Sequence, residues 1–341
     1  MFVRRSLGAV ACLGACALVT AAPGHGATAA SKSVPFQRGV TVADFGRDGY
    51  PPIATKRLLR RLRARHVDTV TLLVSWKQNG ARSVEVRRSP LTVRDSHIVK
   101  AIRSARRAGI RVILRPYVDR NDGGWRGQIR PVSINRWFAS YRRFILHYAR
   151  LARRERARGF VVGTEMVSTS GYDRRWRQLV AAVRRRFSGF VTYQANWDEE
   201  KRVTWWDAVD VISVSAYYEV AKSDDYTVAD LLEGWREPFA TLDALQARVN
   251  RPVMFGEIGY RTVRGTARQP WNTNLNGPYD ETAQLRAYEA ALERWYRVPF
   301  FRGFAWWYVS PKGKLRKLKG GDHQPAQPSL DAMTRYYGTA R

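Results

Sequence analysis

The feature that most constrains the fold is an unbroken alternation of short apolar segments with amphipathic helices between residues 39 and 337. Short apolar runs bounded by turn residues are typical of buried parallel strands, and apolar residues three to four apart are typical of helices. Strands are expected at residues 39–45, 68–76, 111–119, 159–166, 190–197, 210–218, 252–260 and 303–308. Helices are expected at residues 51–66, 93–108, 133–158, 173–187, 228–249, 281–297 and 329–337.

Eight such strand–helix units over about 300 residues predict a (β/α)8 TIM barrel rather than a doubly wound sheet. The first expected strand is not followed by a glycine-rich phosphate-binding fingerprint, which disfavours a dinucleotide-binding fold. The chain has 341 residues, 45% of them hydrophobic, and no change in composition interrupts the alternation. The sequence therefore predicts a single catalytic domain over residues 31–341.

Residues 1–30 have the pattern of a secretory signal peptide. Arg4 and Arg5 precede an apolar run over residues 7–22, and small residues at 27–29 offer a cleavage site. The apolar run is shorter than the roughly 20 residues that a membrane-spanning helix needs. We therefore expect a secreted, extracellular protein.

Both cysteines lie inside this leader, so a cleaved chain would contain none. That excludes disulfides, zinc–thiolate sites and thiol nucleophiles in the mature protein. The sequence ending at Cys16 also resembles a lipoprotein processing site. A cell envelope anchored form, with the lipid attached to Cys16, is the alternative localisation.

The formal net charge of +30 raises the question of a polyanionic partner. The arginines recur in amphipathic helices, where long side chains can cover the helix face and keep their charge in water. We therefore expect no nucleic acid partner. Electrostatic association with an anionic cell envelope is retained as a secondary property, and the protein is expected to be a monomer.

Two of the expected strands end in a glutamate. Residues 252–260 run through apolar residues to Glu257, and residues 159–166 reach Glu165 in the same way. Active sites of TIM barrels lie at the carboxyl ends of the strands, although a lone glutamate there often forms a salt bridge. Counted along the chain, these are strands four and seven, so both carboxylates can face each other across the barrel mouth. Cleavage of a glycosidic bond requires such a pair, and the gap between them decides between retention and inversion.

Aromatic residues cluster near the ends of several expected strands. Roughly half of such rings are expected to pack in the core. Their repeated position at the carboxyl ends also suits contact with the flat faces of sugar rings, and Asn196 could bond sugar hydroxyls. The aromatic candidates are Trp76, Tyr117, Trp125, Trp197, Tyr217, Trp306 and Trp307. The five histidines show no paired spacing typical of metal ligands, so neither a catalytic metal nor a cofactor is expected.

Several short motifs together resemble glycoside hydrolase family 113, whose founding activity is endo-β-1,4-mannanase and which belongs to the retaining clan A barrels. The motifs are Gly163-Thr164-Glu165, Asn196-Trp197-Asp198, Trp206-Asp207, Ala216-Tyr217, Phe255-Gly256-Glu257-Ile258-Gly259-Tyr260 and Trp306-Trp307, with Trp125-Arg126-Gly127 and the segment from Leu114 to Asp119. The resemblance covers nearly all of the chain from residue 38 to residue 308.

The resemblance implies that Glu165 is the general acid/base and Glu257 the nucleophile. It also implies that the Tyr217 hydroxyl orients Glu257. The resemblance further places Asp119, Arg126, Trp306 and Trp307 among the substrate-binding residues, with the two tryptophans forming the floor of the subsite for the cleaved sugar. The expected function is thus retaining hydrolysis of β-1,4-linked mannan-type polysaccharide.

Some positions depart from the clan pattern. Thr164 stands where clan A usually has asparagine, and Arg115 and Tyr117 stand where lysine and histidine are expected. A β-glycosidase of the same fold with another sugar specificity is therefore an alternative. A barrel that binds polysaccharide or the cell envelope without catalysis is the alternative from another class.

Overall fold

The computed structural model describes residues 32–312 and 321–341. The predicted signal peptide therefore lies outside the described residues. Strands and helices alternate as β1 (Gln37–Val42), α1 (Pro52–Ala64), β2 (Thr69–Gln78), α2 (Asp95–Arg107), β3 (Arg111–Arg120), η1 (Arg126–Gln128), α3 (Ile134–Arg154), β4 (Gly159–Thr164), α4 (Asp173–Arg184), β5 (Phe190–Asn196), η2 (Trp206–Ala208), β6 (Val211–Ser215), α5 (Val228–Gly234), α6 (Arg236–Val249), β7 (Val253–Ile258), α7 (Glu281–Trp295), β8 (Phe301–Val309) and α8 (Gln327–Gly338).

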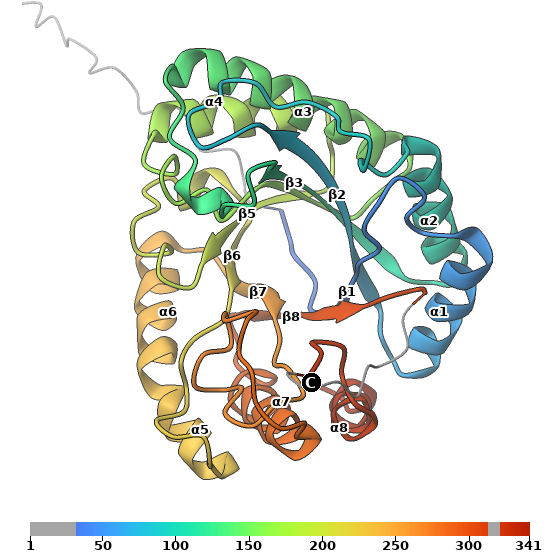
Figure 1. Ribbon diagram of the computed structural model, residues 1–341, viewed down its shortest axis with the longest axis vertical. Coiled ribbons are helices and arrows are strands. Elements are labelled where there is room, and N and C mark those ends of the chain that lie inside the picture. Colours follow the sequence, from blue (N-terminus) through green and yellow to red (C-terminus); the bar gives the residue numbers. More distant parts are fainter. Residues whose placement is uncertain (1–31, 313–320) are drawn as a thin grey trace, which may run out of the picture. The chain divides into compact units, whose positions relative to one another are not determined.

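The strands of the described residues pair in parallel and in chain order, and β8 closes on β1 to complete an eight-stranded barrel. Figure 1 shows the α-helices arranged around these strands. The predicted (β/α)8 TIM barrel is confirmed, and the described residues form one compact unit.

One expected helix is divided. Residues 228–249 form α5 and α6, which meet at Trp235. Pro238 lies in the first turn of α6 and has no backbone N–H to continue the hydrogen-bond ladder of α5. Trp235 is fully buried at the junction and stacks on Phe255 of β7. Burial of such a ring stabilises the break by roughly 1.5–3 kcal/mol or more.

Among the described residues, buried apolar side chains form one large region and two small ones; one small region, Ala43, Leu73 and Tyr117, lies close to Trp307. The large region fills the space between the strands and the outer helices. The other small region lies inside the barrel at the amino-terminal ends of the strands and consists of Val34, Ile113, Val161, Phe190, Val211 and Met254. Farther along the strands, buried polar side chains such as Arg115 and Gln194 replace apolar ones. The interior thus becomes polar toward the carboxyl ends of the strands, where barrel active sites lie.

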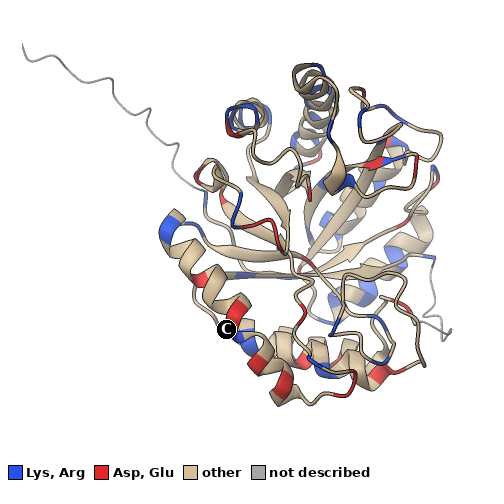
Figure 2. Cartoon of the chain, turned by 60° about the vertical axis from the view of Figure 1, so that its left-hand side comes forward, with Lys and Arg blue, Asp and Glu red and all other residues tan. Residues whose placement is uncertain are grey.

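Charged residues lie mainly on the periphery. In Figure 2, Lys, Arg, Asp and Glu colour helices and loops, whereas the central strands are mostly tan. None of the helices in the described part of the chain combines the length and apolarity needed to cross a membrane.

Candidate active site

A cavity of about 670 Å³ opens at the carboxyl ends of the barrel strands. It is lined by both predicted catalytic glutamates and by most of the predicted substrate-binding residues. From that prediction it contains Tyr117, Asp119, Trp125, Arg126, Glu165, Asn196, Trp197, Tyr217, Glu257 and Trp307. The structure therefore brings together residues from the ends of β3, β4, β5, β6, β7 and β8.

Two predicted substrate-binding residues do not line the cavity. Trp76 packs outside the barrel against α3, where its ring lies 4.9 Å from that of Phe144 and its Nε1–H donates to Tyr148. Trp306 is 1% exposed and stacks at 3.9 Å on Tyr288 of α7. Successive residues of a strand point to opposite faces, so Trp306 and Trp307 cannot both face the barrel interior. The prediction is wrong for Trp76 and Trp306, which are packing residues.

The cavity also contains residues that the sequence did not single out as binding residues. These are Phe45, Arg115, Thr164, Asp198, Pro270, Trp271, Thr273 and His323. Trp271 is 47% exposed and lies in the Pro/Asn/Gly loop after β7. An exposed tryptophan in a polar loop after a barrel strand was a usable signal for a ligand-binding residue.

Irregular strand pairing precedes both glutamates. In the β6–β7 pair, Val214 lies opposite Phe255 but Ser215 lies opposite Glu257, so Gly256 is an extra residue. Such a bulge re-aims the side chain that follows it. A Cβ at Gly256 would approach Ser213 Oγ to 2.2 Å, so a larger residue does not fit there. In a regular strand, residue 256 would point into the barrel and residue 257 would point outward. The bulge therefore directs the side chain of Glu257 into the barrel.

The register of β4 against β5 shifts in the same way before Glu165. Val161 pairs with Thr192 and Thr164 with Gln194, so β4 has one residue more than β5 over this span. Glu165 follows directly with φ of 51°, in the left-handed region that non-glycine residues seldom adopt. Its N–H donates to the Gln194 carbonyl at 2.8 Å. The turn after β4 thus directs Glu165 into the cavity.

Both carboxylate oxygens of Glu257 accept hydrogen bonds. The Tyr217 hydroxyl donates to Oε1 at 2.6 Å, and Arg115 forms an ion pair with Oε2 at 2.7 Å. Gln194 Nε2 lies 3.4 Å from the same Oε2. Arg115 is buried on β3 and also donates to Gln194 Oε1. Glu257 is therefore held in one orientation.

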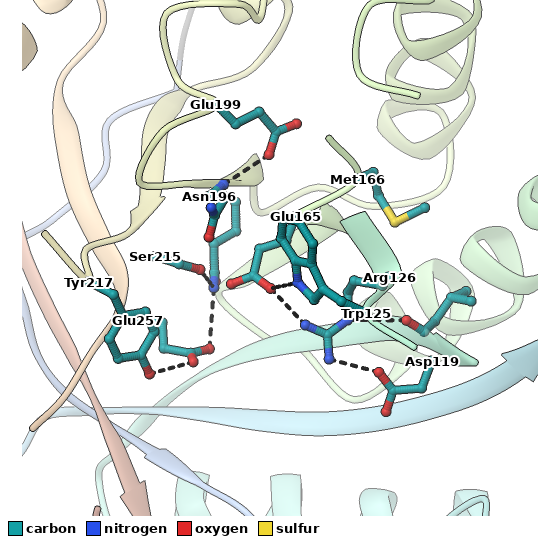
Figure 3. A network of polar contacts seen from close by, with 12 residues as sticks. Asp119, Trp125, Arg126, Glu165, Met166, Asn196, Glu199, Ser215, Tyr217 and Glu257 are labelled. Carbon is teal, nitrogen blue, oxygen red and sulfur yellow. Dashed lines mark hydrogen bonds and ion pairs between the residues drawn. The ribbon is translucent and has the colours of Figure 1, made fainter. Parts of the chain in front are cut away.

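Glu165 is bound on one oxygen. Arg126 Nη1 lies 2.7 Å from Oε2, and Trp125 Nε1 donates to that oxygen at 3.4 Å. Arg126 is shared, because its Nη2 lies 2.7 Å from Asp119 Oδ1. No described residue forms a hydrogen bond with Oε1 of Glu165, which leaves that atom available to a ligand in the cavity. Figure 3 shows Glu257 beside Tyr217, and Glu165 beside Trp125 and Arg126.

The tyrosine beside Glu257 stays neutral. Burial raises the pKa of Tyr217 well above its usual value near 10, and the negative charge of Glu257 raises it further. The hydroxyl therefore remains a hydrogen-bond donor at all ordinary pH values. A neutral donor fixes the orientation of Glu257 without adding a charge to the cavity.

The chemistry of the cavity is that of two carboxylates with different surroundings. One is fixed through both oxygens, and the other presents an unbound oxygen beside exposed aromatic rings. Among the described residues, no group of three or more His, Cys, Asp or Glu side chains could hold a metal ion. Acid-assisted displacement at an acetal carbon needs this combination of groups.

Comparisons with known proteins agree with the geometry. The family model described as Glycoside Hydrolase Family 113 matches residues 17–322. A solved β-1,4-mannanase of that family is 27% identical, with a TM-score of 0.80 over 90% of this chain and 100% of the other. The family 113 β-mannanase from Alicyclobacillus acidocaldarius is 29% identical, with a TM-score of 0.80 over 89% of this chain and 97% of the other.

More distant structures share the fold. The family 5 mannosidase from Rhizomucor miehei is 10% identical and has a TM-score of 0.60 over 89% of this chain and 92% of its own. The search of curated proteins gave no match. The family model covers most of the barrel and both glutamates, so the chain belongs to glycoside hydrolase family 113 and is a glycoside hydrolase.

Proposed function

We propose that the protein hydrolyses β-1,4-linked mannan-type polysaccharide with retention of anomeric configuration. The observation that carries this proposal is the asymmetry of Glu165 and Glu257 within one cavity. The similarity to solved β-mannanases, at 27–29% identity over about nine-tenths of the chain, supports mannan as the substrate.

In the first step, Glu165 donates its proton to the glycosidic oxygen while a carboxylate oxygen of Glu257 attacks the anomeric carbon. The bond to the leaving sugar breaks, and an ester bond forms between the retained sugar and Glu257. In the second step, Glu165 takes a proton from water, the water oxygen attacks the same carbon, and Glu257 is released as a carboxylate. Two displacements on opposite faces give net retention.

The contacts support this division of roles. The nucleophile must be ionised and correctly aimed, and Arg115 and Tyr217 fix Glu257 in that state. The proton donor must gain and lose a proton in each cycle. Glu165 shares the cation of Arg126 with Asp119, so its charge is less fully compensated than that of Glu257.

Aromatic residues supply surfaces for the sugar rings. Trp307 lies in the cavity with Arg115 5.4 Å from the centre of its ring, close to Glu257. Trp125 and Trp271 are both partly exposed at the cavity. Apolar ring faces with polar N–H tips suit the C–H faces and hydroxyls of a polysaccharide.

A reducing-end assay on mannan, glucomannan, galactomannan, xylan and cellulose tests the substrate. We expect the highest rate on mannan or glucomannan. Faster hydrolysis of xylan or cellulose would instead support another specificity, which the departures at Arg115 and Tyr117 allow. Binding without any product would support the non-catalytic alternative. Proton NMR of the first product formed distinguishes retention, which gives the β-anomer, from inversion, which gives the α-anomer.

We also propose that the chain is exported by the signal peptide at residues 1–30, with lipid attachment at Cys16 as the alternative. The charged start, the apolar run and the small residues that follow support export. Amino-terminal sequencing of the extracellular protein tests this. A mature start near residue 31 supports cleavage and release, whereas a lipid-modified chain that starts at Cys16 supports the anchored form.

Association with an anionic cell envelope is a further proposal, and a basic cavity of about 470 Å³ supports it. This cavity lies among the loops that precede β3, β4 and β5, at the opposite end of the strands from Glu165. It is lined by Arg106, Arg111, Arg153, Arg156 and Arg158. Within the described residues, Arg153, Arg156 and Arg158 are exposed and form no ion pair with a carboxylate. Arginine clusters of this kind bind phosphate groups.

Binding to vesicles containing phosphatidylglycerol, measured against salt concentration, tests this association. Replacing Arg153, Arg156 and Arg158 with glutamine should weaken binding and flatten its salt dependence. The matched control replaces Arg136, Arg143 and Arg150, which are exposed on α3, and so changes the net charge equally. Equal weakening by both sets would mean that net charge, rather than the cavity, is responsible.

A further inference from the structure

A second buried glutamate lies beside the acid/base and has no role in the two displacement steps. Glu199 is fully buried in the turn after β5. Within the described part of the chain, no Lys, Arg or His forms an ion pair with it, although buried carboxylates are usually paired with a cation. A carboxylate kept in such a place needs an explanation.

Glu199 is hydrogen-bonded to the turn after β5 directly and to the turn after β4 through Tyr193. Its Oε1 accepts from the Tyr193 hydroxyl at 2.5 Å, and its Oε2 accepts from the Asn196 N–H at 2.9 Å. The Tyr193 oxygen in turn accepts from the N–H of Met166 at 2.9 Å. Met166 directly follows Glu165, and Asn196 lines the cavity, so one side chain connects the two turns. Figure 3 shows the contact between Glu199 and Asn196.

The turn held in this way is strained. Glu165 has φ of 51°, and a non-glycine residue in that region persists only where its surroundings fix it. Hydrogen bonds fix the backbone on both sides: the N–H of Glu165 bonds to Gln194, and the N–H of Met166 bonds to Tyr193. Glu199 supports the second of these through Tyr193.

The groups that face Glu199 leave it able to change charge near neutral pH. Burial raises the pKa of Glu199 to about 7, although hydrogen bonds from Tyr193, the Asn196 N–H and Ser170 oppose this effect. The other titratable groups around it are Glu165, at the end of β4, and the adjacent Glu200. Burial raises the pKa of Tyr193 well above 10, so this hydroxyl remains a donor.

We propose that Glu199 is a positioning residue for Glu165: through Tyr193 and the Asn196 N–H it fixes the turn that carries the acid/base. This inference rests on the proposed acid/base role of Glu165.

The test compares Glu199→Gln with Glu200→Gln. Glu200 is adjacent, also buried, and has its pKa raised to about 7 by burial, but in the described part of the chain its side chain forms no hydrogen bond with Met166 or Asn196. The measurements are pH profiles of kcat/KM on a mannooligosaccharide, which needs acid assistance, and on a dinitrophenyl mannoside, which does not. Circular dichroism and thermal unfolding verify that each variant is folded.

We expect Glu199→Gln to lower kcat/KM on the mannooligosaccharide about tenfold or more, because the acid/base is then less well positioned. The dinitrophenyl substrate should change by less than about threefold, and Glu200→Gln should leave both rates unchanged. Glu199→Asp, whose shorter side chain cannot span the same contacts, should also lower the rate on the mannooligosaccharide.

An unchanged kcat/KM on the mannooligosaccharide in a folded Glu199→Gln protein, or equal losses on both substrates, would overturn the inference. Equal losses in Glu200→Gln would attribute the effect to the removal of any buried carboxylate in this turn and would overturn it as well. Wild-type protein that hydrolyses neither substrate would instead contradict the proposed function itself, so the two failures are distinguishable.

Discussion

Glu257 and Glu165 follow similar apolar strands and enter the same cavity, but their surroundings differ. Glu257 is held through both oxygens by Tyr217 and by buried Arg115, which pairs with no other carboxylate of the described chain. Glu165 is held through one oxygen by Arg126, which it shares with Asp119. The difference is that one carboxylate is fixed through both of its oxygens, whereas the other has one oxygen with no hydrogen-bond partner among the described residues.

The largest effect is expected at the fixed carboxylate. Glu257→Gln removes the attacking oxygen while keeping the shape and most of the hydrogen bonds. The rate on every substrate should fall by on the order of 10⁴-fold or more, because no ester intermediate can form. Steady-state rates on mannan and on an activated aryl mannoside measure this. If the aryl substrate kept wild-type rates, Glu257 would not be the nucleophile.

The next effect is expected at Glu165 and should depend on the leaving group. Glu165→Ala should lower kcat/KM on mannooligosaccharides by roughly 10²–10⁴-fold, the usual scale of general acid assistance. On a dinitrophenyl mannoside, kcat/KM should change far less, because that leaving group departs without a proton. Added azide should restore turnover of the aryl substrate by replacing water that needs a base. Equal losses on both substrates would remove the proposed distinction between the two glutamates.

A smaller effect is expected from the neutral donor beside Glu257. Tyr217→Phe removes one hydrogen bond to a charged group, worth about 1.5–3 kcal/mol, so kcat/KM should fall about 10–100-fold. The loss should be similar for good and poor leaving groups. The pKa of Tyr217 is raised well above 10, so its hydroxyl stays protonated. The pH dependence of the wild-type kcat/KM should therefore show no titration of Tyr217 up to about pH 9. A loss confined to poor leaving groups would assign Tyr217 to the acid instead.

The smallest effect is expected at Asp119, which pairs with the same arginine, Arg126, as Glu165 does. Asp119→Asn removes the competing carboxylate, so Arg126 stabilises ionised Glu165 more strongly. We expect kcat/KM on mannooligosaccharides to fall about threefold, in line with a partly exposed ion pair, and the aryl substrate to be unaffected. An increase in the rate on mannooligosaccharides would contradict this account of charge sharing.

For the aromatic residues, the sequence predicted only partly which rings line the cavity at the barrel mouth. Trp125, Trp197 and Trp307 line the cavity, whereas Trp76 and Trp306 face the outer helices. A tryptophan at a strand end satisfies hydrophobic burial on either face of the sheet, so residue type alone does not decide between them. The face depends on the register of the strand, and the pairing of Trp76 with Val118 places both on the outer side.

The sequence by itself determined the barrel, because its regular alternation of buried strands and amphipathic helices leaves few other architectures. It also determined which two strands carry the glutamates. Only the tertiary structure decided how these side chains are aimed and what binds them. The bulge at Gly256 and the strained turn at Glu165 depend on neighbouring strands. The partners Arg115, Arg126 and Glu199 come from segments far apart in the chain, and a local pattern of residues carries no information about contacts made across the barrel.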